Sequence, residues 1–121
     1  METCIFCKII KGDIPSYKIY EDDYCLCFLD INPVNNGHTL IIPKKHYLDI
    51  NDISLEELNN INNAVKKVYY LLNSKLNPNG IKIVQNNGTL QEVKHYHTHI
   101  IPYFDNETLK DVKDIYDLLT N

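Results

Sequence analysis

Three histidines occupy alternate positions in one short segment, and imidazole can bind metal ions, transfer protons or act as a nucleophile. His95, His97 and His99 lie in the stretch "HYHTHIIP", which ends at Pro102. In an extended strand, alternate side chains point to the same face. At a rise of about 3.3 Å per residue, the first and third rings would lie about 13 Å apart, too far to share one ion. The spacing therefore leaves a catalytic site, a metal site that uses fewer rings, or a polar edge. The edge is disfavoured because buried unpaired polar groups cost about 1–3 kcal/mol each.

Two of the four cysteines have the spacing of half a zinc site. Cys4 and Cys7 form a Cys-x-x-Cys pair, which by itself also fits a redox pair or two buried thiols. Cys25 and Cys27 alternate within "YCLCF", so we expect them to be small core residues. The N-terminal sequence has no long apolar run, which favours the cytoplasm. Cysteines stay reduced there, so metal binding is a better expectation for Cys4 and Cys7 than a disulfide.

The elements that must position these groups follow from periodicity and turn residues. A capping box at Ser54 and Glu57 predicts the start of a long amphipathic helix, which "NPNG" (77–80) ends. A short helical turn is predicted before Gly12, and a C-terminal helix within residues 106–119. The expected strands are Tyr17–Glu21, Tyr24–Asp30, His38–Pro43, Ile81–Asn86 and Lys94–Pro102. This order favours one α+β domain over residues 1–121, an antiparallel five-stranded sheet with one long helix and with its helices on one side.

Composition and charge narrow the range of partners. The chain has 121 residues and a formal net charge of −4, which argues against broad binding to nucleic acid or to an anionic membrane. Its longest apolar runs fall short of the roughly 20 residues of a membrane span. All 12 basic residues are lysines. A phosphate ligand would therefore have to be held by His, Lys, backbone N–H groups or a metal, since no bidentate Arg clamp is present.

The segment "HYHTHII" resembles the signature of the histidine-triad nucleotide-binding family. The segments "CIFCKIIKGDIPS", "YEDD", "CFLDINPVNNGHTLIIPKKH" and "VQNNG" followed by "QEV" stand in the order that this family shows. The resemblance covers about residues 4–102 and leaves 103–121 as a variable tail that we expect to be helical. It implies a two-fold homodimer with one continuous sheet, in which the long helix and the edge strands pair.

The resemblance also implies an enzyme that cleaves a bond to the α-phosphate of a purine nucleotide. His97 would be the nucleophile and would form a covalent nucleotidyl-histidine, which water then hydrolyses. His99 would assist the leaving group, His38 would contact phosphate, and His95 completes the triad. No metal is needed for this chemistry.

The resemblance implies that an apolar wall would bind the base of the nucleotide and that a polar loop would bind its phosphate. Asp30 would accept the ribose hydroxyls, which we favour over the alternative that it only caps the loop that follows. Glu92 departs from the hydroxyl residue common in close relatives, and its charge would repel phosphate unless it points away. The residues that match the base-binding wall are Phe6, Ile9, Ile14, Phe28, Ile31 and Leu40, and those that match the phosphate loop are Asn86, Gln91, Glu92 and Val93.

Some members of the family bind zinc through two cysteines and two histidines. The matching positions here are Cys4, Cys7, His46 and His95, which would hold a structural ion with no open position for water. The resemblance favours a nucleoside phosphoramidase. Hydrolysis of dinucleoside polyphosphates and a non-catalytic regulatory role remain as alternatives. A zinc hydrolase that uses the triad as ligands is disfavoured by the strand spacing and by the lack of a His-Glu-x-x-His motif.

Overall fold

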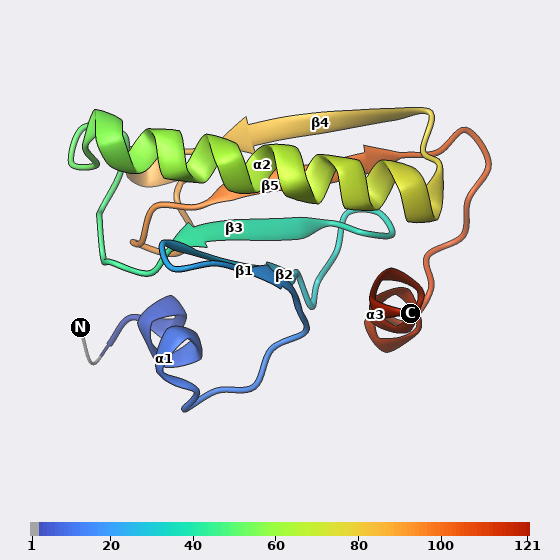
Figure 1. Cartoon of the computed structure of the whole chain (residues 1–121), viewed down its shortest axis with the longest axis horizontal. Helices are drawn as coiled ribbons and strands as arrows, with labels where there is room; N and C mark the ends of the chain where they lie inside the picture. The colour runs from blue at the N-terminus through green and yellow to red at the C-terminus, as the bar shows by residue number, and fades with distance from the viewer. Residues whose placement is uncertain (1–2) are drawn as a thin grey trace.

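One antiparallel sheet of five strands organises the chain, and it confirms the predicted α+β class (Figure 1). The computed structural model describes residues 3–121. The strand order is β1-β2-β3-β5-β4, so the last strand in the sequence lies inside the sheet. The strands are β1 (Lys18–Glu21), β2 (Cys25–Leu29), β3 (Thr39–Pro43), β4 (Gly80–Gln85) and β5 (Thr98–Tyr103).

Three helices and one 3-10 turn complete the fold: α1 (Ile5–Lys11), α2 (Leu55–Leu76), α3 (Val112–Thr120) and η1 (Gly88–Leu90). The predicted cap of the long helix is confirmed, because the hydroxyl of Ser54 accepts the Glu57 N–H at 3.1 Å. The C-terminal helix is shorter than the sequence suggested and begins only at Val112. Among the described residues, no helix combines the length and the apolar character needed to cross a membrane.

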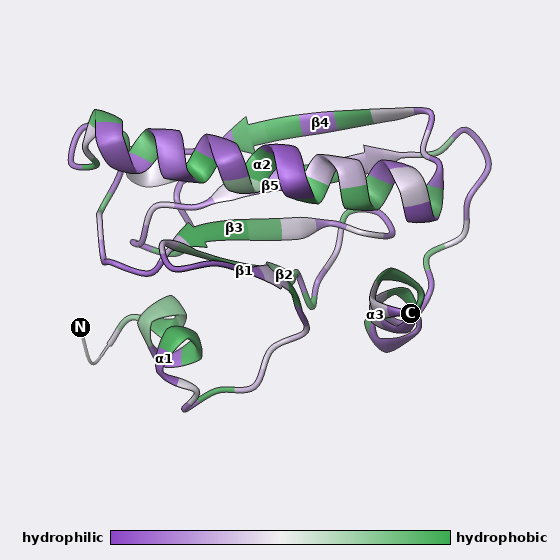
Figure 2. Cartoon of the chain, in the orientation of Figure 1, coloured by the Kyte–Doolittle hydropathy of each residue, from purple (hydrophilic) through white to green (hydrophobic). Residues whose placement is uncertain are grey.

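The sheet is covered on both faces, so the prediction that the helices lie on one side is wrong. In β2, Cys25 and Cys27 face the core under α2 and α3, whereas Leu26 and Phe28 face α1. A strand that is apolar at every position can be stable only if both of its faces are buried. Figure 1 shows α2 lying across the sheet and α1 below it, and Figure 2 shows how hydrophobic α1 and β3 are beside the striped α2.

The strand that carries the triad begins later than predicted. The sequence predicted a strand from Lys94, but β5 starts at Thr98, and of the three triad histidines only His99 lies within it. The register pairs Ile41 with Thr98, so Tyr96 would fall opposite Pro43, which has no N–H to continue the ladder. The alternation of faces survives nonetheless, because Tyr96 packs into the core on the α2 side.

Candidate active site

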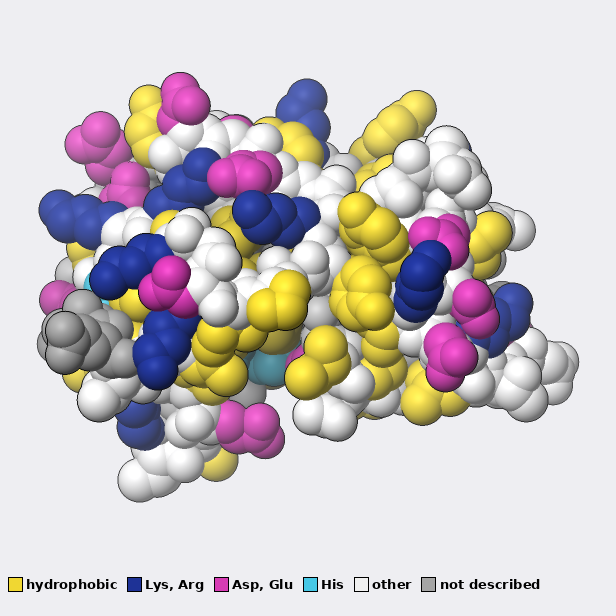
Figure 3. Space-filling model, turned by 90° about the horizontal axis from the view of Figure 1, so that it is seen from below, with side chains coloured by type: hydrophobic (Ala, Val, Ile, Leu, Met, Phe, Trp, Pro, Cys, Tyr) yellow, Lys and Arg dark blue, Asp and Glu magenta, His cyan; other side chains and the backbone are white. Residues whose placement is uncertain are grey.

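A cavity of about 250 Å³ opens on the face of the sheet that α1 covers. Figure 3 views the molecule from below and shows a histidine recessed in a hollow bordered by hydrophobic side chains. Its lining residues are Ile5, Phe6, Ile9, Ile14, Pro15, Ser16, Phe28, Leu29, Asp30, Ile31, Asn32, Leu40, Glu92, Val93, His97 and His99. A larger hollow of about 700 Å³ lies beside α2, but neither histidine nor cysteine lines it. We therefore place the chemistry in the smaller cavity.

The proton of His97 is fixed by the main chain. His97 Nδ1 lies 2.8 Å from the carbonyl oxygen of His95, which can only accept a hydrogen bond, so Nδ1 carries the proton. The lone pair of the neutral ring is then on Nε2. Phe6 packs edge-on against this ring with 5.2 Å between centroids, and the ring is 4% exposed. The neutral form of His97 is thus pre-oriented at the cavity, and its lone pair is on Nε2, where it could act as a nucleophile.

A chain of hydrogen bonds sets the tautomer of His99. The N–H of Val34 donates to His38 Nδ1 at 3.1 Å, so in neutral His38 the proton is on Nε2. His38 Nε2 lies 3.0 Å from His99 Nδ1, which must accept, and this leaves a proton on His99 Nε2. Burial lowers the pKa of both rings, to about 4 for His99, where neighbouring His97 and His38 add to the effect. Both are neutral at pH 7, and His99 offers a proton beside His97.

Asp30 caps the loop that follows it and keeps one oxygen for a ligand. One of its carboxylate oxygens caps the following loop by accepting the Asn32 N–H at 2.9 Å. The other lies 3.7 Å from His38 Nε2, beyond direct hydrogen-bond distance. Because Asp30 also lines the cavity, this second oxygen is free to accept a hydrogen bond from a ligand.

Most of the predicted nucleotide residues come together around this cavity. All six wall residues line it, and so do Glu92 and Val93. Asn86 and Gln91 do not line it, and the buried Gln91 donates its side-chain N–H to the Leu48 carbonyl at 2.7 Å. His38 does not line the cavity either, and it is bonded to His99, which does. Sequence reasoning missed five lining residues, which only their adjacency to named ones could have indicated: Ile5, Pro15, Ser16, Leu29 and Asn32.

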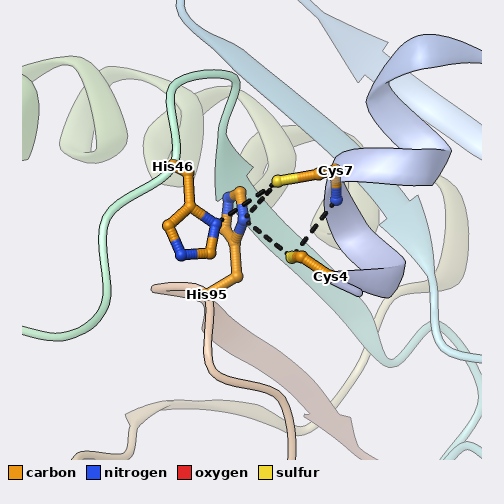
Figure 4. Close-up of side chains that lie close together, drawn as sticks. All are labelled: Cys4, Cys7, His46 and His95. Carbon is orange, nitrogen blue, oxygen red and sulfur yellow. Dashed lines mark hydrogen bonds between the residues drawn. The ribbon is translucent and has the colours of Figure 1, made fainter. Parts of the chain in front are cut away.

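Four potential metal ligands meet behind the triad (Figure 4). The Nδ1 atom of His95 lies 3.4 Å from Cys4 Sγ and 3.6 Å from Cys7 Sγ, and His46 Nδ1 lies 3.3 Å from Cys7 Sγ. A tetrahedral zinc ion, with bonds of about 2.3 Å to sulfur and about 2.0–2.1 Å to nitrogen, holds such atoms about 3.5 Å apart. The site therefore has the size that zinc requires.

The protonation of these ligands also suits a cation. His95 Nε2 donates to the Pro43 carbonyl at 2.9 Å, which leaves the lone pair on Nδ1, toward the sulfurs. Burial is the main cause that lowers the pKa of His95 to about 4, so the ring is neutral. Burial, and then the adjacent Cys4, raise the pKa of the Cys7 thiol, and a bound cation would reverse this by stabilising the thiolate.

Proteins that are similar in sequence and in structure support this interpretation of the site. Residues 11–106 match the HIT domain family. A HIT-like protein of Methanocaldococcus jannaschii is 50% identical, with 93% of this chain and 91% of that protein covered. An adenosine 5′-monophosphoramidase of Schizosaccharomyces pombe is 45% identical, with 83% of this chain and 74% of that protein covered. The crystal structure of a zinc-bound histidine triad family protein from Mycobacterium smegmatis has a TM-score of 0.90 and 33% identity, over 98% of this chain and 91% of that one.

Proposed function

Because the chain belongs to the histidine-triad (HIT) family, we propose that it hydrolyses purine nucleoside 5′-phosphoramidates at the α-phosphorus through a covalent nucleotidyl-histidine. The observation that carries this proposal is that His97 and His99 line the cavity side by side, with 4.9 Å between ring centroids, while hydrogen bonds leave the lone pair of His97 and the proton of His99 on their Nε2 atoms. The similarity to an adenosine 5′-monophosphoramidase supports the same reaction class.

The chemistry needs two displacements at phosphorus. The lone pair on His97 Nε2 attacks the α-phosphorus and the phosphorus–nitrogen bond breaks. The His99 Nε2–H donates a hydrogen bond to the departing nitrogen, which takes its proton from solvent water. Water then attacks the phosphorus and gives up one proton to solvent, while the bond to His97 breaks and releases the nucleoside monophosphate. The proton on His97 Nδ1 stays bonded to the His95 carbonyl and spreads the positive charge that the ring gains.

The nucleotide would lie along the cavity with its base against the apolar wall and its ribose at Asp30. Phe6 and Phe28 meet edge to face at 5.7 Å between centroids and give the base a firm apolar surface. We assign His38 an indirect role, since its Nε2–H is already donated to His99. We expect the phosphate to meet the backbone at Glu92 and Val93, because Asn86 and Gln91 do not line the cavity.

We further propose that zinc occupies the Cys4, Cys7, His46 and His95 site. The zinc would tie α1 to the segments ahead of α2 and β5, and all four positions would be filled by protein atoms, so the ion is structural. The reaction above uses only the chain's own imidazoles and water.

The quaternary structure and location are also proposals. β4 is one of the two outer strands of the sheet, and its Ile83 is half exposed, which supports pairing of two sheets across this edge in a homodimer. The reduced thiols of a zinc site suit the cytoplasm, as the sequence suggested.

Substrate comparison tests the proposed reaction. The protein is incubated with adenosine 5′-phosphoramidate, with diadenosine tetraphosphate and with AMP, and the products are separated by chromatography. We expect AMP and ammonia from the phosphoramidate at a higher kcat/KM than any cleavage of the dinucleotide. Faster dinucleotide cleavage would favour the polyphosphate hydrolase, and AMP binding without turnover of either substrate would favour a regulatory protein.

A further inference from the structure

His95 belongs to both sites described above. Its ring nitrogen Nδ1 faces the sulfurs of Cys4 and Cys7, while its main-chain carbonyl accepts the hydrogen bond that fixes the proton of His97. The ring is fully buried, and its other nitrogen donates to the Pro43 carbonyl. One residue thus connects the metal ligands to the ring that carries the nucleophilic nitrogen.

The main chain that carries this carbonyl lies outside the sheet ladder. β5 begins at Thr98, where it pairs with Ile41 and Gln85. Ahead of that point, the Tyr96 N–H bonds to the Tyr47 carbonyl at 2.7 Å, in a loop rather than in a strand. The peptide unit that carries the His95 carbonyl is therefore held by this one main-chain bond and, on its other side, by the ring of His95, which is bonded to the Pro43 carbonyl.

We propose that His95 is a positioning residue through which occupancy of the Cys4, Cys7, His46 and His95 site controls the tautomer of His97. The Pro43 carbonyl holds the His95 ring at Nε2, and a bound ion would hold it at Nδ1 as well. Its carbonyl then keeps the proton of His97 on Nδ1 and the lone pair on Nε2. Without the ion, only the Pro43 carbonyl would hold the His95 ring. His97 would then also sample the tautomer with its proton on Nε2, in which Nε2 has no lone pair to attack phosphorus.

The consequence for turnover rests on the proposed hydrolase function. Loss of the ion would lower the fraction of His97 that has its lone pair on Nε2 and would also let the ring shift, and a shift of about 1 Å costs up to about 100-fold in rate. We therefore expect kcat to fall by about 10- to 100-fold on ion removal, without reaching zero, because His97 and His99 are still present. An ion that entered the chemistry directly would instead be required for any turnover.

The ring nitrogens of His97 give a readout that does not depend on activity. The full chain, with ¹⁵N-labelled histidine, is examined by long-range ¹H–¹⁵N NMR when loaded with Zn²⁺, after chelation, and after reloading with Cd²⁺. We expect one Nδ1–H tautomer for His97 in both loaded forms and a mixture in the ion-free form, with kcat following the same order. A His97 ring that keeps a single tautomer in folded, ion-free protein would overturn the proposal, whatever happens to turnover.

Variants at His46 separate the ion from the cavity. His46 does not line the cavity and is not bonded to His97, so His46→Ala removes one ligand while leaving the nucleotide site intact. It should mix the His97 tautomers as chelation does, and His46→Cys, which restores four ligands, should reverse this. The exposed neighbour Lys45→Ala is the matched control and should leave both tautomer and kcat unchanged.

Two further outcomes are distinguishable. If chelation unfolds the wild type, the His46→Ala protein is titrated with Zn²⁺ instead, and a His97 tautomer that does not follow occupancy refutes the coupling. If the loaded wild type turns over no nucleotide, the proposed function fails, whereas the tautomer measurement still decides whether His95 links the two sites.

Discussion

Replacement of Asp30 by Asn isolates its proposed contact with ribose. The cap on the Asn32 N–H needs only one side-chain oxygen, and Asn retains one, so the loop should keep its structure. The second oxygen becomes an NH₂ group, which cannot accept from a ribose hydroxyl. A hydrogen bond to a charged group is worth about 1.5–3 kcal/mol, so AMP affinity should fall by about 10- to 150-fold.

Calorimetric measurement of the affinities of two ligands tests the ribose contact directly. Wild-type protein should lose a similar factor when AMP is replaced by 2′,3′-dideoxyadenosine 5′-monophosphate. The Asp30→Asn variant should lose little more with the dideoxy ligand, because the contact is already gone. Asp23→Asn, an exposed change on the β1–β2 turn, is the matched control. Unchanged AMP affinity in Asp30→Asn, or full additive losses with the dideoxy ligand, would refute the ribose assignment.

Two further predictions concern stability. Gly37 has φ +87°, and an added Cβ would lie 2.7 Å from Leu76 Cδ1, so Gly37→Ala should lower the unfolding free energy in urea by about 1–3 kcal/mol. Gly80→Ala, where nothing lies within 4 Å, should be nearly neutral, and equal effects would contradict the steric explanation. The pKa values of His38 and His99 are lowered from 6.5, to about 4 for His99, mainly by burial. Below pH 6.5 the unfolded chain binds protons that the folded chain does not, so the unfolding free energy should fall between pH 6.5 and about 4. Urea titrations that show constant or rising stability on acidification through this range would contradict it.

The long helix and the positions of the first four strands were predictable because they depend on local patterns. The capping box at Ser54 and the period of apolar residues after it fix α2 without reference to the rest of the chain. The two-sided cover of the sheet was readable in principle from β2, where Leu26 and Phe28 alternate with buried cysteines. What the sequence alone does not give is which helix covers which face, since that is decided by long-range packing.

The candidate site was predicted mainly through resemblance, and its errors have physical causes. The late start of β5 comes from Pro43 on the neighbouring strand, a pairing that periodicity along Lys94–Pro102 does not reveal. The place of Gln91 follows from a bond to Leu48, more than 40 residues away in the sequence. The proton chain from Val34 through His38 to His99 likewise exists only once the loop and the strands have met.

The most direct test of the central claim is a mass spectrum of the enzyme quenched during turnover of adenosine 5′-phosphoramidate. The account predicts a peptide that carries one adenylyl group on His97, and predicts that the His97→Ala protein shows neither this adduct nor turnover. An adduct on another residue, or wild-type rates in His97→Ala, would contradict it.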